Sequence, residues 1–201
     1  MRPVATRLDG QRAVVVGADG ALATAIRAAL AAAGATPGSL DGTPIDVVVH
    51  LARGTGATRA LVDTDESAWE TAAEAPTRAL LATLQAAHPG LRAGPGRLVV
   101  VIPTVALDGA AGLVAQATGW EAVRLLAKSA ARRWGEQGVA VNIVAFRPTG
   151  PPDATRATPA LGPEHRDDEA VAATVLLLAS DEAAHLSGAT LQADGGALML
   201  P

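Results

Sequence analysis

Residues 13–33 read AVVVGADGALATAIRAALAAA, and this stretch decides the fold. Its first four residues are an apolar, β-branched run that is typical of a buried strand, and Gly17 ends the run. The alanine-rich segment 21–33 stops before Gly34, which predicts a helix. A strand that passes at once into a helix predicts a parallel sheet if the alternation continues along the chain.

The alternation of strand and helix patterns does continue to the end of the chain. Apolar runs without polar interruption are typical of parallel strands that are buried on both faces. Pro76 should bend the helix in which it falls, because it removes one backbone donor. We therefore expect one α/β domain over residues 1–201, with a doubly wound, Rossmann-like parallel sheet. The expected strands are 13–16, 45–50, 97–102, 139–146 and 190–193, and the expected helices are 21–33, 65–88, 113–136 and 168–179.

The composition excludes several classes of function. The chain has 201 residues, of which 49% are hydrophobic, so it is long enough to bury a core. Its net charge is −4 and no basic stripe is visible, which argues against a nucleic-acid partner. It has no cysteine, and its four histidines lack metal-ligand spacing, so we expect no metal. No apolar run approaches the ~18 residues of a membrane span, and the first residues do not resemble a signal peptide. We expect a cytoplasmic protein with no membrane partner.

Several segments resemble the short-chain dehydrogenase/reductase family, and they occur in the family's order. VVGADGALA at 15–23 is similar to the glycine-rich turn, and DVVVHLA at 46–52 is similar to the strand that leads into an Asn-Asn-Ala-Gly motif. GVAVN at 138–142 looks like the family's Val-Asn signature. LASD at 178–181 and the segment 188–196, which ends Asp-Gly-Gly, look like its C-terminal signature. These matches cover nearly the whole chain apart from residues 35–44.

That gap indicates what the chain has lost. Members of the resembled family are longer, and the missing part falls between the first helix and Asp46. In the doubly wound strand order 3-2-1-4-5-6, strands 1 and 4 are neighbours. Loss of the region of strands 2 and 3 therefore removes one edge of the sheet and keeps its middle. Residues 35–40 are a candidate remnant of strand 2, although Pro37 and Gly38 are poor strand residues.

The resemblance implies an NAD(P) cofactor whose pyrophosphate lies on the glycine-rich turn. In this chain the two later glycines of the turn are Ala21 and Ala23, Asp19 adds a negative charge, and the Asn-Asn-Ala-Gly positions read HLAR at 50–53. Asp41 follows Gly17 at nearly the spacing of a ribose-binding carboxylate, but a turn aspartate in Asp41-Gly42 is the ordinary alternative. We expect no cofactor, with NAD(P) as the alternative. The candidate cofactor-binding residues are Gly17, Ala18, Asp19 and Asp41.

The resemblance also implies a catalytic tyrosine, lysine, serine and asparagine. Counting back from the Val-Asn pair places Gln116 at the tyrosine position, Trp120 at the lysine position and Pro103 at the serine position. Counting from Trp69 places Pro76 at the asparagine position. Glutamine has no accessible pKa, indole carries no cation and proline has no side-chain donor. The chain contains no tyrosine at all, so a shift of one residue in the alignment cannot restore the phenol. The four positions are Gln116, Trp120, Pro103 and Pro76.

Two nearby residues could act in place of the missing groups. The hydroxyl of Thr104 could orient a carbonyl, and His50 could titrate near pH 7. Ordinary structural roles, as a strand-end hydroxyl and a hydrogen-bonded histidine, are the alternative for both.

The helix at 113–136 offers a second role for the chain. Trp120 and Trp134 lie near one helix face, with Trp120 filling the former cleft and Trp134 either in the core or in an interface. The resembled family dimerises through this helix and the one before it. We therefore expect a homo- or hetero-oligomer with a subunit of the short-chain dehydrogenase/reductase fold. These observations predict a catalytically degenerate protein that serves as a non-catalytic or scaffolding subunit beside an intact reductase. The alternatives are an NAD(P)-dependent oxidoreductase with non-standard residues and a small-ligand binding module.

Overall fold

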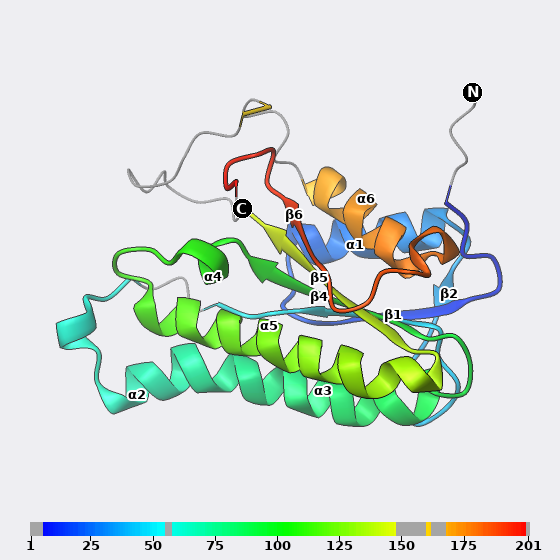
Figure 1. Cartoon of the computed structure of the whole chain (residues 1–201), viewed down its shortest axis with the longest axis horizontal. Coiled ribbons are helices and arrows are strands. Elements are labelled where there is room, and N and C mark those ends of the chain that lie inside the picture. The colour runs from blue at the N-terminus through cyan, green and yellow to red at the C-terminus, as the bar shows by residue number, and fades with distance from the viewer. Residues whose placement is uncertain (1–5, 55–57, 148–159, 162–167, 200–201) are drawn as a thin grey trace.

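A six-stranded parallel sheet forms the centre of the computed structural model, which describes residues 6–54, 58–147, 160–161 and 168–199 (Figure 1). The strand order is β2-β1-β3-β4-β5-β6, and every pair of neighbours is parallel. This confirms the α/β, doubly wound architecture expected from the alternating pattern. The strands are β1 (Arg12–Gly17), β2 (Thr36–Pro37), β3 (Val47–Leu51), β4 (Arg97–Pro103), β5 (Ala140–Phe146) and β6 (Thr190–Ala193).

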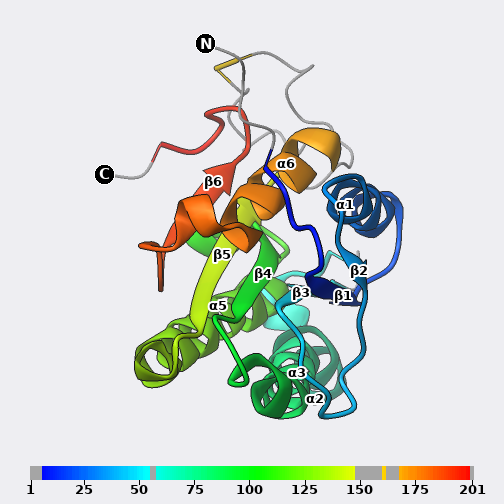
Figure 2. The ribbon, with the colours of Figure 1, turned by 90° about the vertical axis from the view of Figure 1, so that its right-hand side faces the viewer.

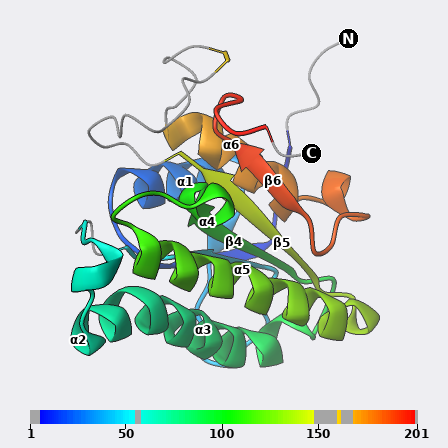
Figure 3. The ribbon, with the colours of Figure 1, turned by 60° about the vertical axis from the view of Figure 1, so that its left-hand side comes forward.

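Helices cover both faces of the sheet (Figure 2). Successive side chains of a strand point to opposite faces, so Val49 packs in the cluster with Ile26 of α1, and Val48 packs in the other cluster with Leu84 of α3. Helices α1 and α6 lie over the first face, and α3 and α5 lie over the second (Figures 2 and 3). The helices are α1 (Ala21–Ala32), α2 (Glu66–Trp69), α3 (Ala75–Leu91), α4 (Val105–Asp108), α5 (Val114–Trp134) and α6 (Asp168–Ala179).

The helix expected over 65–88 is divided in the structure. Helix α2 passes into a π-helical turn, Glu70–Glu74, and α3 then begins with Pro76 as its second residue. Because proline has no N–H to donate to the preceding turn, the α-helical hydrogen-bond pattern is interrupted there. The wider π turn lies directly before this interruption. The helix also continues past the expected end at residue 88 to Leu91 and includes Pro89 in its last turn.

The shortened side of the sheet keeps a trace of strand 2. Strand β2 has two residues, and they pair with Arg12 and Ala13 at the start of β1. The chain then turns back, and β3 begins beside Ala13, so that one helix joins two neighbouring parallel strands. The remnant of strand 2 is therefore confirmed, and the middle of the sheet is intact.

Two arginines donate to carbonyl oxygens of β1 beyond the part that β2 covers. The carbonyl oxygens of Gln11 and Ala13 accept hydrogen bonds from the β2 segment, and alternate carbonyls of the strand point the same way. The next carbonyl in this series, that of Val15, accepts a long hydrogen bond of 3.5 Å from Arg27 Nη2. The carbonyl of Gly17 accepts one of 2.8 Å from Arg53 Nη2. The guanidinium of Arg27 thus stands where a longer β2 would supply a backbone donor, whereas Arg53 reaches from the segment after β3 to the turn at Gly17.

Within the described ranges, no helix combines the length and apolar character that a bilayer span requires.

Candidate functional site

Gln116 and Trp120 come together beside Gly54. They lie one turn apart on α5 and are 4% and 5% exposed. A Cβ atom built on Gly54 would lie 3.2 Å from Gln116 Oε1 and 2.7 Å from Trp120 Cζ2, so only glycine fits there. Two of the four expected catalytic positions therefore meet at the segment that follows β3.

The indole of Trp120 is fixed by a polar contact as well as by packing. Its Nε1 donates a hydrogen bond of 3.0 Å to the backbone carbonyl oxygen of Arg53. A buried indole with a satisfied N–H is a stable arrangement, because the apolar ring and the polar edge are both accommodated. The ring closes the space between the end of β3 and α5, and it brings no positive charge to this space.

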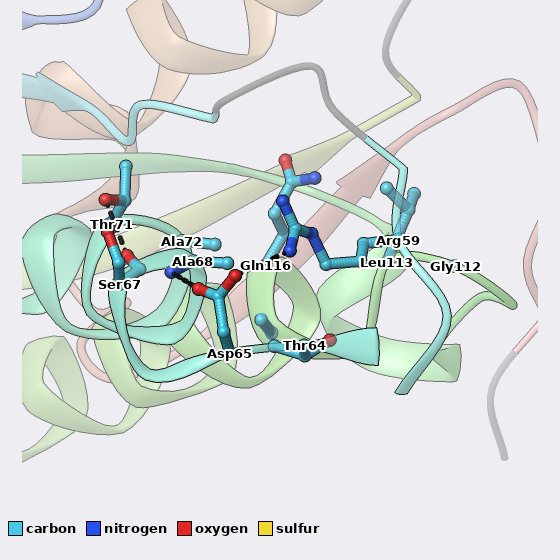
Figure 4. Close-up of a pocket in the computed structure, with 11 residues that line it drawn as sticks. Arg59, Thr64, Asp65, Ser67, Ala68, Thr71, Ala72, Gly112, Leu113 and Gln116 are labelled. Atoms are coloured by element: carbon cyan, nitrogen blue, oxygen red, sulfur yellow. Dashed lines mark hydrogen bonds and ion pairs between the residues drawn. The ribbon is translucent and has the colours of Figure 1, made fainter. Parts of the chain in front are cut away.

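A cavity of about 290 Å³ opens on the other side of Gln116 (Figure 4). Its walls come from the loop that carries Arg59, from α2 and the π turn, and from the first turns of α5. The Gln116 side chain can donate and accept hydrogen bonds but cannot exchange a proton near neutral pH.

Pro103 and Thr104 lie at the carboxyl end of β4. Pro103 is the last residue of β4 and pairs with Phe146 of β5. The backbone N–H of Thr104 donates to the carbonyl oxygen of Phe146 over 2.8 Å, and the residue is buried at the start of α4. Pro76 is buried in α3, on a different helix from Gln116. The sheet end and α3 thus carry prolines at the two remaining catalytic positions.

The expectation that His50 could titrate near pH 7 is wrong. The ring is 2% exposed at the end of β3, and burial, together with the nearby charge of Arg53, lowers its pKa to about 4. Its Nδ1 lies 3.0 Å from Thr83 Oγ1, and this hydroxyl donates its own proton to the carbonyl of Ala79. An Nδ1–H donor fits this arrangement, and Nε2 has no hydrogen-bond partner among the described residues. The neutral ring cannot supply a proton at neutral pH.

The turn at Gly17 is occupied by contacts within the chain. Gly17 has a φ of 101°, and a Cβ atom there would lie 2.1 Å from the carbonyl oxygen of Leu51, so the close approach of β1 and β3 requires glycine. The N–H of Ala18 donates to that same oxygen over 2.9 Å. Asp19 forms an ion pair of 3.1 Å with Arg27.

Asp41 lies at the opposite end of β1 from Gly17. Its carboxylate accepts hydrogen bonds from the N–H and the hydroxyl of Thr43, and these bonds lower its pKa to about 2. Thr43 Oγ1 in turn accepts from Arg12, the first residue of β1. Six strand residues span about 16 Å between the ends of β1. A cofactor resting on Gly17 would therefore not bring its ribose to Asp41, and the candidate ribose-binding role is corrected to that of a turn aspartate.

Sequence reasoning missed two features of this region. Arg53 stands at the glycine of the Asn-Asn-Ala-Gly motif, but nothing in the sequence indicated that its side chain would reach back to Gly17. The paired charges of Arg59 and Asp65, 2.8 Å apart at the cavity, fall in a segment without any motif. Across the described residues, no group of three or more His, Asp or Glu side chains is placed to hold a metal.

Comparison with known proteins agrees with this geometry. A family model described as enoyl-(acyl carrier protein) reductase matches residues 1–197. The short-chain reductase protein NovJ of Streptomyces niveus is 30% identical over 210 residues, which cover 96% of this chain and 77% of that protein. The chain belongs to the short-chain dehydrogenase/reductase family. Its resemblance to this family, inferred from the sequence motifs, is confirmed.

Solved structures of short-chain dehydrogenase/reductase proteins share the fold. A short-chain type dehydrogenase/reductase from Mycobacterium ulcerans superposes with a TM-score of 0.80 at 20% identity, over 94% of this chain and 90% of that one. A dehydrogenase/reductase from Sinorhizobium meliloti 1021 gives a TM-score of 0.76 at 20% identity, over 97% and 98% of the two chains. In the present chain, β2 has two residues and the indole of Trp120 packs against Gly54.

Proposed function

We propose that this short-chain dehydrogenase/reductase protein is a non-catalytic subunit that assembles with an intact subunit of the same fold. The observation that carries the proposal is the buried Trp120. Its ring stands at the family's lysine position, donates to the Arg53 carbonyl and packs against Gly54. A lysine there would hold a cation beside the reacting groups, whereas the indole fills the space and supplies one neutral donor that is already used.

The residues around Gly17 do not fit a dinucleotide bound in the family's manner. The adenosine half of such a cofactor rests beyond the carboxyl ends of strands 1 to 3. Here β2 ends beside Ala13, near the start of β1. Among the described residues, no carboxylate follows β2 at the carboxyl end of the sheet. In the turn itself, the N–H of Ala18 is used by the Leu51 carbonyl, and Asp19, although paired with Arg27, places a carboxylate near the expected phosphates. We infer that the chain has given up stable NAD(P) binding.

Proton transfer lacks a donor as well. The chain has no tyrosine, Gln116 does not ionise, and His50 is neutral because burial lowers its pKa to about 4. The hydroxyl of Thr104 could orient a carbonyl, but it would need a partner that exchanges a proton. These substitutions support a protein that keeps its fold and does no reduction by itself.

The outer face of α3 and α5 is the surface we assign to the partner subunit. The two helices lie side by side (Figure 3), and each exposes a leucine, Leu81 at 44% and Leu125 at 53%. Trp134 is not the anchor of this face, because its ring stacks on His88 of α3 with a centroid distance of 4.8 Å. The assignment rests on the family resemblance, which implies subunit contact through these two helices, and the two exposed leucines are apolar surface that such a contact would bury.

Two measurements test the proposal. Calorimetry of the purified chain with NAD(H) and NADP(H) at millimolar concentration should show no binding. Reduction of a ketone by the isolated chain would instead establish the alternative, an NAD(P)-dependent oxidoreductase with non-standard residues.

Co-expression tests the partnership itself. The chain should co-elute with an intact reductase of the family encoded beside it, and Leu125→Asp should abolish co-elution. Leu177→Asp is the matched control, because Leu177 is 41% exposed on α6, on the other side of the sheet. A chain that stays monomeric with every such reductase, or that forms only homo-oligomers, would overturn the proposal.

A further inference from the structure

The cavity beside Gln116 shares this residue with the closed cleft but lies mostly on other elements. Arg53, Gly54 and Trp120 are not among its lining residues, which belong to the loop before α2, to α2 and the π turn, and to the start of α5 (Figure 4). At about 290 Å³ it is near the lower end of the range for small-molecule sites. The lining residues are Arg59, Thr64, Asp65, Ser67, Ala68, Thr71, Ala72, Gly112, Leu113, Ala115 and Gln116.

One positive and one negative group stand side by side at this cavity. Arg59 Nη1 donates to Asp65 Oδ2 over 2.8 Å and to the carbonyl of Asp63 over 3.1 Å. Arg59 Nε and Nη2 have no partner among the residues that the structure describes. Asp65 is the N-cap of α2, and its Oδ1 accepts from the N–H of Ala68 over 2.7 Å. Each group is therefore held at one side, and both head groups point into the cavity in Figure 4.

The remaining wall combines apolar side chains with the polar side chains of Thr64, Ser67, Thr71 and Gln116. Ala68, Ala72, Leu113 and Ala115 contribute methyl and isobutyl surface next to the two charges. The hydroxyl of Thr71 is already used, because it donates to a backbone carbonyl within the helix. The wall thus offers apolar contact and few further donors.

We propose that this cavity binds a small α-amino acid. A ligand carrying only a carboxylate would pair with Arg59 but would face the ionised Asp65, and a ligand carrying only an amine would face Arg59. A zwitterion satisfies both groups at once, with its carboxylate on the free donors of Arg59 and its ammonium on Asp65. Its side chain then lies on the alanine and leucine wall, and the size of the cavity selects a small aliphatic one.

This site goes beyond the subunit role and does not depend on it. The Arg59 and Asp65 side chains are 49% and 62% exposed, so the charges remain hydrated and affinity is weak. We expect a dissociation constant on the order of 1 mM for L-valine.

The test is a titration of the full chain with L-valine, followed by ¹H–¹⁵N chemical shifts. Saturable shifts should be confined to the backbone amides of the lining residues. Isobutyrate and isobutylamine, which each carry one of the two charges, should give no saturable shift in the same concentration range. Equal responses to isobutyrate and to L-valine would overturn the proposal, as would the absence of saturation with L-valine.

Two variants and a control locate the site. Arg59→Gln and Asp65→Asn should each weaken L-valine binding at least about tenfold, since each removes one charged partner. Asparagine is as good an N-cap as aspartate, so Asp65→Asn should leave α2 folded, which circular dichroism checks. Arg78→Gln removes an exposed arginine that pairs with Glu74 outside the cavity, and it should bind L-valine as the parent does. Unchanged binding by a folded Arg59→Gln would refute the assignment.

Discussion

The indole nitrogen of Trp120 and the backbone carbonyl of Arg53 are joined by a hydrogen bond of 3.0 Å that ties α5 to the end of β3. The family uses this helix position for a charged group that takes part in the reaction. Here the side chain at this position packs inside the closed site. A substitution of Trp120 should therefore lower the free energy of unfolding.

Trp120→Ala should lower the free energy of unfolding by about 3–5 kcal/mol, because it removes a large buried ring and leaves a cavity. Urea denaturation followed by circular dichroism measures the change. Trp69→Ala is the control, since that ring is 36% exposed on α2 and its loss should cost much less. Equal losses in the two variants would show that Trp120 does not pack as described.

His50 should make the protein less stable in mild acid. The pKa of His50 is lowered from 6.5 to about 4 in the folded state, so between these values the unfolded chain binds a proton that the folded chain does not. Stability is therefore complete above about pH 6.5 and falls as the pH decreases towards 4, by about 3 kcal/mol in all.

His50→Asn should flatten this part of the pH profile of unfolding. His185→Gln, at an exposed histidine, should leave the profile unchanged. A parent protein with a flat profile from pH 6.5 to 4 would mean that the ring is protonated in the fold.

Gly119→Ala should destabilise the contact between α5 and the π turn. A Cβ atom at Gly119 would lie 2.7 Å from the carbonyl oxygen of Ala73 and 2.8 Å from that of Ala72, and neither backbone atom can move freely. We expect a loss of about 1–3 kcal/mol in chemical denaturation. Gly135→Ala meets nothing within 4 Å at an ordinary φ, so it should be neutral or slightly stabilising. The same sign for both variants would contradict the close helix contact.

Arg27→Ala should promote self-association more than it changes stability. It removes the side chain that stands at the Val15 carbonyl of β1 beyond the end of β2, and an uncovered strand edge pairs readily with another chain. Light scattering at increasing protein concentration should detect aggregates in Arg27→Ala and not in Arg78→Ala. An Arg27→Ala variant that scatters like the parent would show that this arginine does not protect the edge.

The order of elements and the main catalytic substitutions could be predicted from the sequence, because both depend on local patterns. Apolar runs gave the strands, and the Val141-Asn142 pair set the register that put Gln116 and Trp120 at the catalytic positions. The structure places both side chains beside Gly54, and their equivalence to the family's catalytic positions stays a prediction.

The features that could not be predicted from the sequence depend on contacts between elements that are distant along the chain. Spacing alone suggested Asp41 as a ribose ligand, but β2 is so short that the chain turns back before it reaches the other end of the sheet. The pKa of His50 depends on burial beneath α3, and the reach of Arg53 to Gly17 depends on the packing of three elements. No local pattern encodes these distances.

The direct passage from β1 through α1 to β3 has a consequence for how the chain folds. The backbone N–H of Arg12 donates a hydrogen bond of 2.7 Å to the carboxylate of Asp46. These residues are 34 positions apart, so the pairing of β1 with β3 closes a short loop. A shorter loop costs less entropy to close, and a lower contact order is associated with faster folding. The short connection between α1 and β3 therefore keeps the pairing of β1 with β3 comparatively local, and we expect a lower entropic cost of forming it than in a longer chain of the same fold.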